Sequence, residues 1–105
     1  MIDINEYKDA MFKSTNYQEA LNNILEVVNK YQEHSILENL KIPGYEDIMH
    51  CSIIKAGENL EFLINKNLDS ESFIVRLYRI TEAQSLKPIA TMINSNGTIE
   101  KYEFN

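Results

Sequence analysis

The sequence predicts an α+β fold with two layers, in which two N-terminal helices pack on one face of a five-stranded antiparallel β-meander. Apolar residues recur at helical spacing before residue 47 and at every second position after it. The 105 residues include only three Gly and two Pro, and no repeat or low-complexity tract interrupts them. We therefore expect a single domain over 1–105, with a helical layer at about 3–41 and a sheet layer at about 48–104.

Two capping signals mark the starts of the predicted helices. Asp3 is followed three residues later by Glu6, and Asn16 by Glu19, which is the spacing of a capping box. After the second signal, apolar or small residues recur at alternating steps of four and three, at Tyr17, Leu21, Ile24, Val28, Tyr31 and Ser35. This stripe predicts a long helix that lies on the sheet.

The end of the long helix is less sharply marked than its start. Leu37 and Leu40 fit a continuation of the helical pattern. Pro43-Gly44 cannot continue a helix, so we expect the helical layer to end before it.

Two alternating runs, 49–54 and 60–65, predict the first β-hairpin. Gly57-Glu58 stands between them with glycine first, as a two-residue type II′ turn prefers. That register pairs Ile53 with Phe62 on the core face and leaves Ile54 on the opposite face.

The last hairpin has the strongest short signal in the sequence. Runs 89–93 and 99–104 flank Asn96-Gly97, a dipeptide typical of type I′ turns. In this register Thr91 opposes Tyr102.

The strand predicted at Phe73–Ile80 shows two different faces, with Phe73, Val75 and Leu77 on the helix side. No later helix follows to cover the opposite face of the sheet, which mixes apolar and polar residues. Arg, Tyr and Met are enriched at protein interfaces. The candidate interface residues on this face are Ile54, Leu63, Ile74, Arg76, Tyr78 and Met92.

Charge restricts the choice of partner. Sixteen acidic and ten basic residues give a net charge of -6, which repels a phosphate backbone, so we expect no direct nucleic-acid binding. Nine of the acidic residues and only four basic residues fall in 1–47, which makes the helical layer the acidic one. A partner protein with a basic surface would complement it.

The sequence lacks the patterns that mark catalytic, cofactor or metal sites. Its three glycines stand at 44, 57 and 97, too far apart for a phosphate-binding loop. His50 and Cys51 are adjacent on a predicted strand, so their side chains project to opposite faces and cannot share a proton. We expect no catalytic residue, no cofactor and no metal, with Cys51 as a small buried hydrophobe on the core face.

The compartment is predicted from the same residues. The N-terminus carries Asp3 and Glu6 where a secretion signal needs basic residues, and no apolar run approaches the roughly 20 residues of a membrane span. A lone cysteine cannot form an internal disulfide. We expect a cytoplasmic protein without a membrane partner, and the abundance of Ile, Asn and Lys indicates a bacterial or phage source.

These observations favour a small acidic protein that binds another protein without catalysis, as an inhibitor, immunity or accessory factor. In one alternative, the open sheet face pairs with a second copy of the chain and buries Tyr78 and Met92. In another, a small molecule binds in a pocket between helix and sheet. The residues expected to line that pocket are Tyr31, His34, Cys51 and Tyr102.

Overall fold

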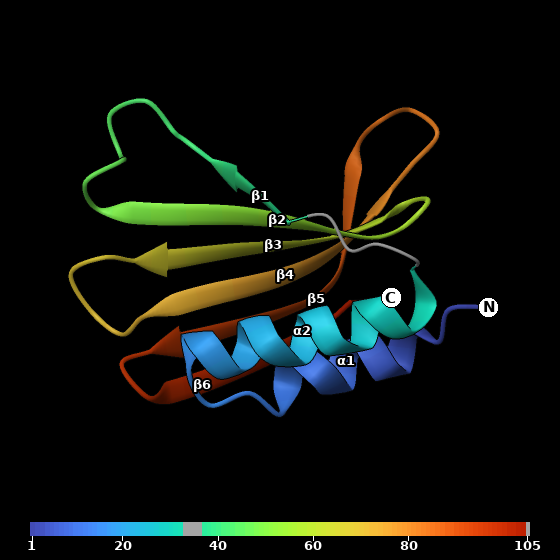
Figure 1. Ribbon diagram of the computed structural model, residues 1–105, viewed down its shortest axis with the longest axis horizontal. Helices are drawn as coiled ribbons and strands as arrows, with labels where there is room; N and C mark the ends of the chain where they lie inside the picture. The colour runs from blue at the N-terminus through green and yellow to red at the C-terminus, as the bar shows by residue number, and fades with distance from the viewer. Residues whose placement is uncertain (33–36, 105) are drawn as a thin grey trace.

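The computed structural model describes residues 1–32 and 37–104, and within them two helices lie against one face of a six-stranded sheet (Figure 1). All strand pairs are antiparallel, and the sheet order β1-β2-β3-β4-β5-β6 follows the chain. The two-layer α+β class is therefore confirmed, with one strand more than predicted. The elements are α1 (Ile4–Phe12), α2 (Tyr17–Tyr31), β1 (Leu37–Leu40), β2 (Met49–Gly57), β3 (Leu60–Asn67), β4 (Phe73–Ile80), β5 (Leu86–Ser95) and β6 (Thr98–Glu103).

Both helices begin where the capping signals predict. Oδ1 of Asp3 accepts a hydrogen bond from the backbone N–H of Asn5 at 2.9 Å, and Oδ1 of Asn16 accepts one from Glu19 at 2.9 Å. The stripe of α2 buries its centre on the sheet, at Ala20, Ile24 and Val28. His34 and Ser35, which the pattern assigned to this helix, lie outside the described residues.

Leu37–Leu40 forms a strand, so the predicted continuation of the helix through these leucines is wrong. The chain leaves the helical conformation at Gln32, whose φ is -111° and ψ 136°. Residues 37–40 then pair with β2, with Leu37 opposite Ile54 and Leu40 opposite Cys51. Four residues with leucine at both ends fit the helical period and the strand period equally well. The free backbone groups along the edge of β2 favour the strand, because they form hydrogen bonds with it.

The first hairpin has a different turn from the predicted one. Gly57 pairs with Leu60, the turn residues are Glu58 and Asn59, and a bulge lies between Lys55 and Gly57. As a result Ile54, not Ile53, is opposite Phe62. Because a one-residue slip moves every side chain of a strand to the other face, Ile54 is fully buried under the helices, and its assignment to the interface is wrong.

Met92 is the second interface residue that the structure corrects. It lies opposite Val75 on the helix-facing side and is fully buried. All four residues of Ile89–Met92 are buried, including Thr91 on the open face, so burial does not distinguish the two faces of this segment. Leu77 pairs with Ala90 and Tyr78 with Pro88, so Ile89 is an extra residue in β5 and changes the phase of the alternation along that strand.

The last two strands follow the prediction. Thr91 lies opposite Tyr102, and the connecting Asn96 and Gly97 have positive φ angles of 51° and 102°. Tyr102 nevertheless remains 45% exposed, so it is not part of the core. The core lies between the helices and the sheet, and its large fully buried side chains are Tyr7, Met11, Ile24, Val28, Ile54, Phe62, Ile64, Phe73, Val75, Leu77 and Met92.

No helix within 1–32 or 37–104 has both the length and the apolar character that crossing a membrane requires.

Candidate interface on the open sheet face

The face of the sheet that points away from α1 and α2, called the open face here, is defined by the strand register. Figure 1 shows both helices on one side of the sheet. Two rows of side chains cross the open face. The first row contains Glu38, Ile53, Leu63, Arg76, Thr91 and Tyr102. The second row contains Leu40, Cys51, Asn65, Ile74, Ile93 and Glu100.

Four of the six predicted interface residues lie together on this face. Leu63 is directly opposite Arg76, Ile74 lies one row away, and Tyr78 is opposite Glu61. Leu63, Ile74, Arg76 and Tyr78 are all half-buried in the isolated chain. An apolar centre beside an arginine and a tyrosine is the composition that protein interfaces favour.

Two apolar residues of the open face were absent from the prediction. Ile53 replaces its neighbour Ile54, and Ile93 replaces its neighbour Met92. Both are half-buried and extend the apolar centre over four strands. The signal that would have found them is the register of the adjoining strands, which depends on bulges that leave little trace in the sequence.

Charged groups surround this apolar centre. Lys55 and Glu61 form an ion pair beside Tyr78. Glu38 and Glu100 stand at the β1 and β6 ends of the two rows, and Arg76 stands between them on β4. The open face therefore has an apolar middle and a polar margin, as interfaces between proteins do.

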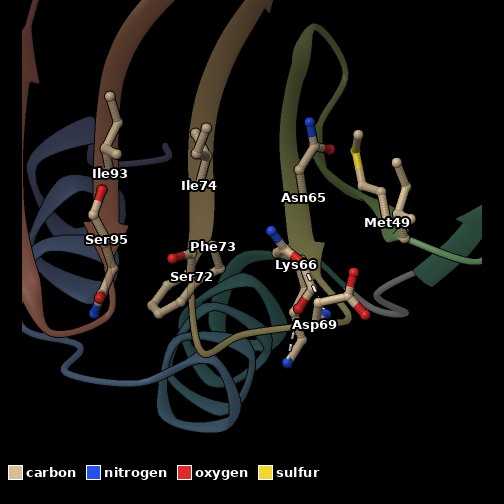
Figure 2. Close-up of a pocket in the computed structure, with 12 residues that line it drawn as sticks. Met49, Asn65, Lys66, Asp69, Ser72, Phe73, Ile74, Ile93 and Ser95 are labelled. Atoms are coloured by element: carbon tan, nitrogen blue, oxygen red, sulfur yellow. Dashed lines mark hydrogen bonds between the residues drawn. The ribbon is translucent and has the colours of Figure 1, made fainter. Parts of the chain in front are cut away.

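A pocket of about 400 Å³ lies at the end of the open face, where the β3–β4 loop meets the start of β2 (Figure 2). The side chains of Ile74, Ile93 and Met49 give it apolar walls. Its remaining lining residues are Ile48, Asn65, Lys66, Asn67, Asp69, Ser72, Phe73, Asn94 and Ser95.

One polar atom in this pocket lacks a partner. Oδ1 of Asn65 is buried, and no donor within the described part of the chain reaches it. By contrast, the loop at the rim is well bonded, since the backbone N–H of Asp69 donates to Oδ1 of Asn67 at 2.8 Å. Nζ of Lys66 donates to the carbonyl oxygens of Asn67 and Ser70 at 3.3 and 3.4 Å.

The residues proposed for a pocket between helix and sheet are not brought together. Cys51 projects from the open face, while Tyr31 ends α2 on the other side of the sheet. His34 lies outside the described residues, and Tyr102 also belongs to the open face. The structure thus provides a pocket on the face opposite to the one expected.

Cys51 is buried, as predicted, but not on the core face. Its side chain shares the open-face row with Leu40 and Asn65 and is 2% exposed. Burial raises the pKa of the Cys51 thiol, which disfavours the reactive thiolate. His50 points to the other face of β2, as expected from alternation.

The helical layer contains a separate polar cluster that joins the two helices. Nζ of Lys30 bonds both carboxylate oxygens of Glu6, at 2.9 and 2.7 Å, and the hydroxyl of Tyr31 donates to the same carboxylate at 2.7 Å. These hydrogen bonds from Lys30 and Tyr31 lower the pKa of Glu6. Beneath them, Tyr7 donates to the carbonyl of Ala56, and burial raises its pKa to about 12.

Within the described ranges, no group of three or more His, Cys, Asp or Glu residues could hold a metal ion.

Comparison with known proteins gives one distant similarity. The chain is 32% identical over 103 residues to an uncharacterised RNA methyltransferase of Streptococcus agalactiae, a match that covers 97% of this chain. The chain spans only 22% of that protein's length. No family model matches the chain, and no solved structure does.

Proposed function

We propose that the chain is a small non-catalytic protein-binding factor that docks on a larger protein through its open face. The observation that carries this proposal is the half-buried apolar centre formed by Ile53, Leu63, Ile74 and Ile93, with Arg76 and Tyr78 beside it. A contiguous apolar area with a polar margin is typical of a surface that a partner covers.

The similarity to the streptococcal methyltransferase supports a role in which the chain binds a larger protein. The related segment makes up about a fifth of that protein, so it is joined to further polypeptide there. We propose that this chain acts as an accessory or inhibitory factor of a bacterial or phage system. Its partner is then a larger protein, and an RNA-modifying enzyme is the first candidate.

The charge of the chain supports a protein partner over nucleic acid. A net charge of -6 opposes contact with phosphates, whereas it attracts a basic protein surface. In this proposal the open face supplies the contact, and the net negative charge of the chain steers the approach.

The test is affinity capture of the tagged chain from native cell lysate at low and high salt, followed by affinity measurement with the captured protein. Replacing Arg76 and Tyr78 by Ala should weaken that affinity by about 2 kcal/mol or more for each if they anchor the interface. Two matched controls remove the same residue types elsewhere. Arg79→Ala lies on the same strand but alternates to the opposite face, and Tyr45→Ala lies in an exposed loop.

Two outcomes would contradict the proposal. Full affinity of the Arg76 and Tyr78 variants, with the fold intact, would place the interface elsewhere. Recovery of the bare chain as a dimer would instead assign the open face to a second copy, which the molecular mass of the captured material distinguishes.

A further inference from the structure

The pocket at the end of the open face combines apolar walls with one unsatisfied acceptor. Oδ1 of Asn65 is buried, and no donor in residues 1–32 or 37–104 bonds to it. Native structures satisfy nearly all buried polar atoms, because leaving one unpaired is unfavourable. An unpaired acceptor in the lining of a pocket therefore indicates that a donor from outside the chain completes it.

The surroundings of Asn65 restrict the chemistry of that donor. The walls beside it are Ile74 and Ile93, which favour an apolar group. The charged groups of the lining are of opposite sign, Lys66 and Asp69, so the pocket does not select for net charge. The Lys66 ammonium already donates to two carbonyl oxygens. The fitting ligand is thus uncharged and combines an apolar body with an N–H donor, as a heteroaromatic ring with an N–H group does.

Access to the acceptor involves Met49. It pairs with Asn67 on β2–β3, so it is the diagonal neighbour of Asn65 on the open face, and Figure 2 shows the two side chains next to each other. A methionine side chain is unbranched and adapts easily to a new neighbour. Because Oδ1 of Asn65 is itself buried, we infer that a ligand reaches it by displacing the adjacent Met49 side chain.

We propose that this pocket binds a small uncharged heteroaromatic molecule, with its ring against Ile74 and Ile93 and its N–H donated to Oδ1 of Asn65. The volume of about 400 Å³ is within the range of ligand pockets. This inference does not rest on the proposed protein partner, because the pocket is formed by the chain itself. The same chemistry is available from a free molecule or from a tryptophan side chain of a partner.

The test compares indole with 1-methylindole, which has the same ring system but no N–H donor. Binding is followed through the methyl resonances of Ile74, Ile93 and Met49, and we expect indole to bind about three to ten times more tightly. N-acetyltryptophanamide and its 1-methyl analogue form a second arm, which distinguishes a side-chain source from a free molecule.

Two variants locate the effect. Asn65→Val removes the acceptor and should abolish the preference for indole over 1-methylindole. Asn29→Val makes a matched change on the exposed surface of α2, outside the pocket lining, and should leave the preference intact. Equal affinities of the two probes for the unmodified chain, or no shift at Ile74 and Ile93 with any probe, would overturn the proposal without reference to either variant.

Discussion

Ile53 and Ile54 are adjacent residues of the same type that lie on opposite faces of β2. Ile54 is fully buried among the core side chains, while Ile53 is half-exposed on the open face. Truncating a fully buried isoleucine removes apolar contacts and leaves a cavity. Their position, not their chemistry, therefore determines what each contributes to stability.

Ile54→Ala is expected to lower the free energy of unfolding by about 2–5 kcal/mol. Ile53→Ala should lower it by less than about 1.5 kcal/mol, because its side chain is only half-buried. Urea denaturation of the two variants measures both values. Equal losses would contradict the observed β2–β3 register.

At the same scale, Glu6 makes stability depend on pH. Its pKa is lowered in the folded state by hydrogen bonds from Lys30 and Tyr31, so it contributes stability above the pKa of the unfolded state. That contribution is lost as pH falls through the folded-state pKa. Replacing Glu6 by Gln should lower the thermal midpoint near neutral pH, and the difference from the unmodified chain should shrink in acid. A difference that stays constant with pH would show that the carboxylate charge has no part in it.

At the scale of the element, the turn between β5 and β6 shows why some signals in the sequence are reliable. Gly97 has a φ of 102°, and nothing lies within 4 Å of a Cβ added there. Glycine is therefore required here for its backbone conformation and not for lack of space. The two turn residues fix the register of the whole hairpin.

Gly97→Ala should lower the free energy of unfolding by about 1–2 kcal/mol, since an L side chain is strained at positive φ. Ser95→Ala, just outside the turn, serves as the control and should change stability by less than about 0.5 kcal/mol. Thermal or urea denaturation distinguishes the two. A neutral Gly97 variant would indicate that the turn relaxes to a different type.

The other elements differ in whether neighbouring or distant residues determine their conformation. Asp3 and Asn16 cap their helices within a few residues, and the sequence alone was sufficient to place both helix starts. By contrast, Leu37–Leu40 forms a strand only because β2 lies beside it. Four residues are too few for their apolar pattern to predict which element they will pair with.

At the scale of the whole molecule, the helices cover one face of the sheet and leave the other to solvent or a partner. The net charge of -6 acts between molecules, because like charges oppose the approach of two copies. Salt screens this repulsion over a Debye length of about 10 Å at 0.1 M. Association with a basic protein responds to salt in the opposite direction.

We therefore expect the purified chain to sediment as a monomer in low salt. Any dimer that forms through the open face should increase as salt is added, whereas a complex with a basic partner should weaken. Sedimentation velocity at several salt concentrations, with the Arg76→Ala and Tyr78→Ala variants as controls, measures both trends. A dimer that is strongest in low salt would contradict this expectation.

The sequence by itself determined the α+β class, both helix starts, the faces of β4 and the hairpin at Asn96-Gly97. These features depend on periodicity, capping and turn chemistry, which act over a few residues. The tertiary structure decided that Leu37–Leu40 is a strand, that Ile54 and Met92 face the helices, and that the pocket lies on the open face beside Asn65. The physical reason is that one bulge reverses a strand's faces, and where a bulge forms depends on pairing with distant residues.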